Sequence, residues 1–311
     1  MINEEDILVT GGTGMVGFAL KNIIPGAQFV GSKDYDLTQE QQVSKMLTYY
    51  KPKYIVHLAA KVGGIKANID NVGSFFYDNI KINSNVLEQS RLHKVEKVVS
   101  LLSTCIYPHS AKYPLTENQI HLGAPHFSNF GYAYAKRMLD VQSRAYRQQY
   151  NCNFITAVPN NLFGENDNFH LQNSHVIPAL IRKIYDAKIN GKSKINLWGT
   201  GEPLREFTYS KDVAKILLFL LKKYNGVGPI NIGNTNEYSI KYVVDEIFKI
   251  FEYECEVFWD TKKPSGQYKK PSCNDNLTSL GWEKNNYTNF DIALKKTCEW
   301  FIINYPNIRG V

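Results

Sequence analysis

Residues 6–23 place a short apolar run, a glycine-rich turn and a helical run in direct succession. They read DILVT, then GGTGMVG, then FALKNI. Glycines in such a turn let backbone N–H groups approach a pyrophosphate, and the helix that follows adds a partial positive charge at its start. This order near the N-terminus is typical of a nucleotide-binding βαβ unit, with an empty structural turn as the alternative. The expected nucleotide contacts in the turn are Gly11, Gly12, Thr13, Gly14, Met15, Val16 and Gly17.

Apolar runs alternate with helical patterns through the first half of the chain. This alternation predicts an α/β fold with a Rossmann-type, doubly wound parallel sheet. The expected strands cover residues 6–10, 28–32, 54–60, 95–103 and 153–159, and the expected helices cover 39–49, 70–93 and 131–150.

The rhythm changes after Pro159, where Asn, Gly and Pro become frequent. We therefore expect a nucleotide-binding domain at residues 1–160, with a returning segment near 206–235, and a smaller C-terminal α/β substrate domain at 161–311 built from discontinuous segments. Further helices are expected at 175–188, 211–223, 239–252 and 290–303, with strands at 228–234 and near 255–259.

Charge and cysteine content narrow the functional classes. Lysine and arginine number 36 against 29 acidic residues, which suits an anionic ligand, but no basic run of a nucleic-acid binder is present. The five cysteines show no CxxC spacing, so we expect neither a disulfide framework nor a metal site. The acidic start MINEED and the lack of a long apolar stretch predict no signal peptide and no membrane span. We expect a cytoplasmic protein.

The end of the second expected strand bears on the choice between NAD and NADP. An NAD site usually places a carboxylate there to accept the ribose 2′-hydroxyl. Ser32 and Lys33 instead offer a hydroxyl and an ammonium, which suit a 2′-phosphate. Asp34 and Asp36 follow, so a solvated turn stays open, but the residues favour NADP(H).

Tyr132 and Lys136 form a YxxxK pattern on an expected helix, where positions i and i+4 share a face. A neighbouring ammonium lowers the pKa of a tyrosine and can reach the ribose of a nicotinamide cofactor. Ser103, at the end of the fourth expected strand, can hydrogen-bond a substrate oxygen. A surface pair is the alternative, since YxxxK alone is common.

Taken together, TGGTGMVG, HLAA, STCIYP and YAYAK resemble the extended short-chain dehydrogenase/reductase family. Residues 59–68, 103–108, 167–180 and 198–207 are similar, more narrowly, to the members that make GDP-L-fucose. The resemblance covers nearly the whole chain. It implies NADPH-dependent 3,5-epimerisation and 4-reduction of GDP-4-keto-6-deoxy-D-mannose. The alternatives are another nucleotide-sugar substrate, or a non-catalytic NADP-binding regulatory protein.

Cys105 is the residue that a plain reductase does not need. Inverting a carbon beside a ketone requires a base on one face and an acid on the other, and a thiolate can act as such a base. We expect Cys105 and Ser103 to leave an extended segment on the same side. The resemblance makes Cys105 the base and His175 the acid, whereas a buried cysteine and a capping histidine are the alternatives. His170 is a nearby competitor.

The resemblance also implies ligand contacts and an assembly. Cys273 stands where members often have Asp, and Thr13 stands where bacterial members often have a basic residue. A homodimer through helices 70–93 and 131–150 is expected. The implied cofactor residues beyond the glycine turn are Ser32, Lys33, Asp36, Leu37, Leu58, Ala59, Ala60, Lys136, Asn161, Leu162 and His175. The implied GDP-sugar residues are Lys183, Trp198 and Arg205, with a surface lysine, a core tryptophan and a structural salt bridge as alternatives.

Overall fold

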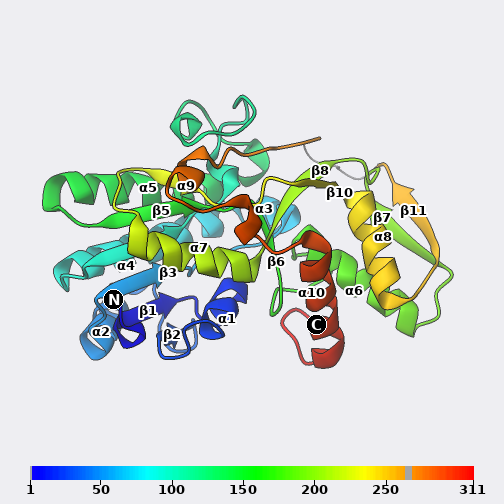
Figure 1. Ribbon diagram of the computed structural model, residues 1–311, viewed down its shortest axis with the longest axis horizontal. Coiled ribbons are helices and arrows are strands. Elements are labelled where there is room, and N and C mark those ends of the chain that lie inside the picture. The colour runs from blue at the N-terminus through cyan, green and yellow to red at the C-terminus, as the bar shows by residue number, and fades with distance from the viewer. Residues whose placement is uncertain (1, 263–267) are drawn as a thin grey trace.

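The computed structural model describes residues 2–262 and 268–311, and it places them in two bodies side by side (Figure 1). The larger body is built on a parallel sheet of six strands in the order β2-β1-β3-β4-β5-β9. The fold class expected from the sequence is confirmed. The strands are β1 (Ile7–Thr10), β2 (Gln28–Val30), β3 (Tyr54–His57), β4 (Lys97–Leu101), β5 (Phe154–Val158) and β9 (Pro229–Asn231).

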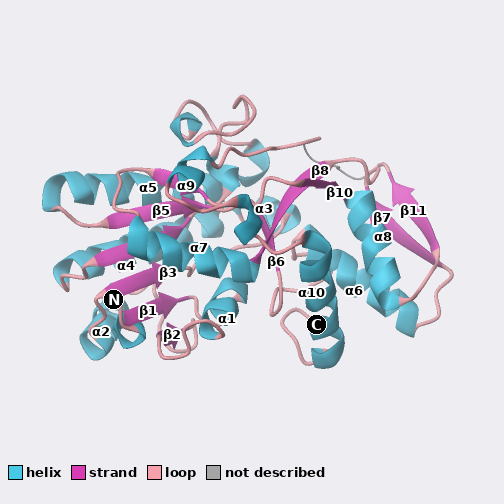
Figure 2. Ribbon diagram, in the orientation of Figure 1, coloured by secondary structure: helices cyan, strands magenta, loops and turns pink. Residues whose placement is uncertain are grey.

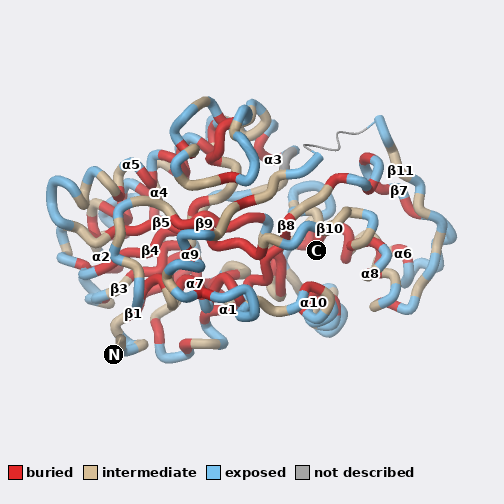
Figure 3. Tube along the Cα trace, turned by 45° about the horizontal axis from the view of Figure 1, so that its top comes forward, coloured by how far each residue is buried: buried red, intermediate tan, exposed pale blue. Residues whose placement is uncertain are grey.

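Helices cover both faces of this sheet (Figure 2). One face packs on α1 (Met15–Lys21) and α7 (Ser210–Lys223), around buried residues such as Val9 and Leu217. The other face carries α2 (Glu40–Tyr50), α4 (Val72–Leu92) and α5 (Phe130–Tyr150), with Leu87 and Leu139 buried between them. Strand residues are buried on both faces, as the near-continuous burial along the sheet shows (Figure 3). That pattern explains why these strands have mainly apolar sequences.

The smaller body combines two short sheets with three helices. One sheet has the order β10-β8-β6 and the other pairs β11 with β7. Phe163 and Phe301 lie in their shared core. The elements are β6 (Asn161–Phe163), β7 (Lys194–Trp198), β8 (Leu204–Tyr209), β10 (Glu237–Ser239), β11 (Glu256–Asp260), α6 (Val176–Ile189), α8 (Ile240–Phe251) and α10 (Phe290–Asn304), with a short α9 (Asp275–Ser279) near the larger body.

The chain returns once to the larger sheet. β9 pairs with β5 through Ala157 and Ile230, although β8, just before α7, belongs to the smaller body. Leu277 and Trp282 also pack in the core beneath α7. No helix in the part of the chain that the structure describes is long and apolar enough to cross a membrane.

Two expected elements differ most from the structure, while the strands expected at 54–60 and 228–234 are shorter, at Tyr54–His57 and Pro229–Asn231. The helix expected at 70–93 is two helices, α3 (Ile65–Asp70) and α4, because Asn71 leaves the helical conformation at φ −130°. The strand expected at 95–103 ends at Leu101, and Thr104–Ile106 form a turn of 3-10 helix. The sequence did not predict β7, whose pairing partner β11 lies far along the chain.

Candidate active site

The glycine turn after β1 is shaped by close backbone approaches. Gly11 has φ +70°, and a Cβ there would lie 2.7 Å from the backbone nitrogen of Ala59. A Cβ on Gly17 would lie 2.5 Å from the Gly12 carbonyl oxygen. A Cβ on Gly14 would lie 3.3 Å from the Gly11 carbonyl oxygen, which is also a close approach. This cradle fits the pyrophosphate of a dinucleotide.

In the turn after β2, the carboxylates have local hydrogen-bond partners, whereas the hydroxyl and the ammonium are exposed. Ser32 and Lys33 are exposed. Asp34 accepts a hydrogen bond from the Gly31 N–H at 2.7 Å, and Asp36 accepts two from Thr38. Both carboxylates already have local partners, and the residues that remain open fit a 2′-phosphate.

The other expected cofactor residues divide into two groups. Leu58, Ala59 and Ala60 follow β3 and lie half-buried, with Ala59 against the glycine turn. Leu37 and Leu162 instead pack against the hydrophobic cores of the larger body. These two therefore have a packing role besides any contact with a cofactor. Asn161, which was also expected to contact the cofactor, donates a hydrogen bond from its side-chain amide to the Glu206 carbonyl.

The backbone from Ser103 to Cys105 has a different conformation from the one expected. The backbone is extended at Ser103, but Thr104–Ile106 turn at once into a 3-10 helix. The prediction of one extended segment through Cys105 is wrong. The physical reason is a cap, since the Ser103 hydroxyl oxygen accepts the Cys105 N–H at 3.4 Å. The two side chains still lie together, because Ser103 also hydrogen-bonds the Cys105 thiol and opposes the rise in its pKa that burial causes.

α5 brings Tyr132 and Lys136 to the same place. The Lys136 ammonium donates a hydrogen bond to the Leu101 carbonyl at 2.7 Å, at the end of β4, and burial lowers its pKa to about 8. Burial raises the pKa of Tyr132 well above its ordinary value, and Cys105 adds to this rise. The pKa of Tyr132 is therefore not lowered, although the neighbouring Lys136 was expected to lower it. The phenol of Tyr132 is therefore protonated at neutral pH.

His175 occupies the N-cap position of α6 and is open to solvent. Desolvation by the surrounding protein lowers the pKa of His175, and the positive charge of Arg309 lowers it further. His170 has a different use, since its Nδ1 accepts the N–H groups of Gln172 and Asn173. The backbone thus occupies the ring of His170, and His175 as the acid stays a prediction.

The three expected GDP-sugar residues lie in the smaller body. The Lys183 ammonium stands over the Trp198 ring, 5.6 Å from its centre, and burial lowers the pKa of Lys183. Trp198 is 51% exposed, so it is no core residue. Arg205, on β8, donates hydrogen bonds to the carbonyls of Leu204 and Tyr268.

Two basic residues near these groups were not expected from the sequence. Lys270 donates a hydrogen bond to the Thr104 carbonyl at 2.8 Å, beside Cys105. Arg309 extends from the C-terminal segment to 3.9 Å from where a Gly14 Cβ would lie. Lys270 belongs to the pair Lys269-Lys270, and such lysine pairs usually lie on a solvated surface. No sequence pattern indicates a role for Arg309. The expectation drawn from Thr13 was that Lys33 takes more of the phosphate recognition.

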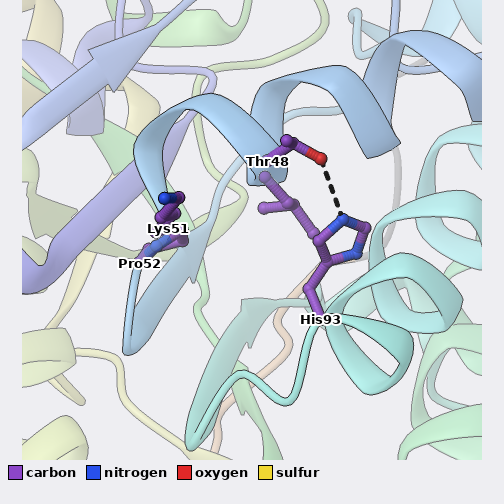
Figure 4. A pocket seen from close by; sticks show the side chains of 5 residues that line it. Thr48, Lys51, Pro52 and His93 are labelled. Atoms are coloured by element: carbon purple, nitrogen blue, oxygen red, sulfur yellow. Dashed lines mark hydrogen bonds between the residues drawn. The ribbon is translucent and has the colours of Figure 1, made fainter.

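A separate hollow lies at the far end of α2, lined by residues that include Thr48, Lys51, Pro52 and His93 (Figure 4). Thr48 Oγ1 and His93 Nε2 are 3.2 Å apart and hydrogen-bond each other. The polar groups of this hollow are satisfied locally, and it contains none of the residues discussed above.

Comparison with known proteins places this site in a family. The sequence matches the NAD dependent epimerase/dehydratase family over residues 7–233. The chain belongs to that family. Among its relatives in this family, GDP-L-fucose synthase of Dictyostelium discoideum is 41% identical over 99% of this chain and 98% of its own. GDP-L-colitose synthase of Yersinia pseudotuberculosis is 35% identical over 95% and 97%.

A solved structure from this epimerase/dehydratase family agrees in fold. The GDP-L-fucose synthetase of Naegleria fowleri bound to NADP superimposes with a TM-score of 0.90 at 39% identity, covering 97% of this chain and 95% of that one. The resemblance drawn from the motifs is therefore confirmed, and the protein is an epimerase/reductase enzyme.

Proposed function

We propose that the protein converts GDP-4-keto-6-deoxy-D-mannose to GDP-L-fucose by 3,5-epimerisation and NADPH-dependent 4-reduction. The observation that carries the proposal is the thiol of Cys105 beside the reductase set Ser103, Tyr132 and Lys136. A reductase uses the last three alone, and a thiol next to them serves proton abstraction beside a ketone.

The cofactor site is formed by the glycine turn and the turn after β2. Gly11, Gly14 and Gly17 give the pyrophosphate close access to backbone N–H groups, and Ser32 and Lys33 meet the 2′-phosphate. The pyridine ring supplies a hydride when the cofactor is bound. Lys136, fixed on the Leu101 carbonyl, lies within the site to bind the ribose hydroxyls.

In epimerisation, the Cys105 thiolate takes a proton from the carbon beside the 4-keto group. The electron pair of that C–H bond moves into the enolate, whose oxygen accepts hydrogen bonds from Ser103 and Tyr132. His175 returns a proton to the other face of the carbon. The same groups act at the second carbon. The lowered pKa of His175 means that its proton, once acquired, is readily given up.

In reduction, the 4-keto oxygen becomes a hydroxyl and needs one proton. Tyr132 supplies it, since its raised pKa keeps the phenol protonated until negative charge develops on the substrate oxygen. The GDP group lies toward the smaller body, where Lys183, Trp198 and Arg205 offer two cations and an exposed indole.

Turnover is tested with GDP-4-keto-6-deoxy-D-mannose and NADPH by the loss of absorbance of the reduced cofactor. Failure of a folded, NADPH-binding preparation to oxidise the cofactor would refute the proposal. In deuterium oxide, Cys105→Ser should stop incorporation of deuterium beside the ketone while NADPH binding persists. The similarity to GDP-L-colitose synthase makes another GDP-4-keto sugar the second candidate, and faster turnover of such a sugar would select it.

We also propose a homodimer and a cytoplasmic location. The support for the dimer is a set of exposed apolar side chains on the paired helices α4 and α5, which are Phe76, Tyr77, Tyr134, Met138 and Val141. Burying such a face is favourable. The division into domains at 1–160 and 161–311, with the return near 206–235, stays a proposal supported by the separate cores. Sedimentation of the wild type and of Met138→Glu tests the dimer, since a monomeric wild type contradicts it.

A further inference from the structure

Lys270 brings a positive charge to the end of β4 from a distant part of the chain. Its Nζ donates a hydrogen bond to the Thr104 carbonyl at 2.8 Å, across 166 positions of sequence. Thr104 is the residue between Ser103 and Cys105. The ammonium is thereby fixed to the same turn of backbone that carries the thiol.

The chain after Lys270 is itself held in place. Pro271 accepts a hydrogen bond from the Leu115 N–H at 2.8 Å. Ser272 donates two to the buried carboxylate of Glu206, from its N–H at 2.8 Å and from its hydroxyl at 2.6 Å. Lys270 is therefore positioned by its neighbours, unlike a surface lysine that rotates freely in solvent.

The charged groups near the Cys105 thiol come from two parts of the chain, the segment of Lys270 and helix α5. Burial raises the pKa of Cys105, and the largest opposing effect of any charge comes from Lys270, ahead of Lys136. Tyr132 and Arg137 on α5 also face this thiol. Of these groups, Tyr132 is neutral at neutral pH. The ammonium of Lys136 also favours the thiolate, and like that of Lys270 it donates to a backbone carbonyl, that of Leu101 in β4.

The groups around Lys270 act on its charge in opposite directions. Burial and the nearby guanidinium of Arg205 lower the pKa of Lys270, whereas Cys105 raises it. His126 also lies within the range of this ammonium, and its own pKa is lowered. Of the groups that face Lys270 within the described residues, the thiolate form of Cys105 is the one that favours its positive charge.

We propose that Lys270 is a positioning residue whose ammonium, held on the Thr104 carbonyl, stabilises Cys105 as the thiolate that abstracts the substrate proton. The thiol first releases its proton to water. The thiolate then takes a proton from the carbon beside the ketone, and the C–H electron pair moves into the enolate. This inference rests on the proposed epimerisation for its role, but the pairing of ammonium and thiolate can be measured without substrate.

The test follows alkylation of Cys105 by iodoacetamide across pH, with mass spectrometry of the Cys105 peptide. Lys270→Met should move the midpoint of alkylation upward by about one pH unit, since an adjacent opposite charge shifts a pKa by roughly 1 to 3 units. Lys270→Arg keeps the charge and should stay closer to the wild type. Lys269→Met is the matched control, because this neighbouring lysine is exposed.

An unchanged midpoint in Lys270→Met would overturn the inference, and so would equal increases in the Met and Arg variants, which would indicate packing in place of charge. Buried Cys298 reports folding, since its alkylation marks unfolded protein. If Lys270→Met fails that check, Lys270→Gln takes its place. Absence of turnover by the wild type, together with the expected midpoint shift in Lys270→Met, would refute the proposed function alone.

Discussion

His57 should make the protein lose stability as the pH falls below neutral. It ends β3 beneath the glycine turn, is 1% exposed, and lies between Thr10 and Asn83. His57 Nδ1 is 2.7 Å from Thr10 Oγ1, and Nε2 is 3.1 Å from Asn83 Oδ1. The amide oxygen of Asn83 can only accept, so Nε2 carries the proton and Nδ1 accepts from the Thr10 hydroxyl. The neutral ring satisfies both partners.

Charging this ring is costly. Burial, and secondly the ammonium of Lys136, lower the pKa of His57 from 6.5 to about 3. His57 therefore binds a proton near pH 6.5 in the unfolded chain, but only near pH 3 in the folded protein. Between these two values, the free energy of unfolding decreases as the pH falls. Each pH unit within it costs about 1.36 kcal/mol, so lowering the pH from 6.5 to about 5 should cost about 2 kcal/mol.

The assay compares urea unfolding of the wild type and His57→Gln at about pH 7.5 and about pH 5, followed by tryptophan fluorescence. Glutamine removes the titration, so the variant should lose about 2 kcal/mol less than the wild type between the two pH values. Every other titrating group is present in both proteins and cancels from the difference. Equal losses would show that His57 is charged within the folded protein, and the reasoning would fail.

Three further substitutions test other parts of the structure. Gly17→Ala puts a Cβ 2.5 Å from the Gly12 carbonyl and should destabilise the turn by about 1–3 kcal/mol, with NADPH affinity falling at least about tenfold in fluorescence titrations. Arg309→Gln removes the cation beside Gly14 and should weaken NADPH binding roughly two- to fivefold at low salt, with a smaller difference at high salt; identical affinities would contradict this. Lys97→Met strips hydrogen bonds of 2.9 and 2.7 Å from two carbonyls at the end of α7 and should cost about 2–4 kcal/mol in urea unfolding, with KM unchanged.

The sequence predicted the larger sheet well because its information is local. Each buried parallel strand is a mainly apolar run, and each helix between strands has its own periodicity. The requirement for Gly17 is also local, since its Cβ would meet the Gly12 carbonyl, whereas Gly11 is required by Ala59, which follows β3. Tyr132 and Lys136 follow from helix geometry alone. These features could all be predicted before any tertiary contact was known.

The sequence failed where distant segments decide the geometry. β8 pairs with both β6 and β10 in the smaller body, and nothing near it in the sequence specifies either partner. At Cys105 the competing effect was a side-chain cap, because Ser103 satisfies a backbone N–H and starts a 3-10 turn where alternation suggested a strand. Lys270 reaches the site only through the fold.

The two acids of the site, Cys105 and Tyr132, differ in the cations that act on them. Burial drives both the thiol of Cys105 and the phenol of Tyr132 toward their protonated forms. Reduction needs the phenol to keep its proton until the end, but epimerisation needs the thiol to lose its proton at the start. A single cation shared by both groups would favour the two ionisations together. Lys270 and Lys136 both oppose the rise in the pKa of Cys105, whereas neither is among the causes that shift the pKa of Tyr132, so that proton abstraction can precede proton donation at one substrate ketone.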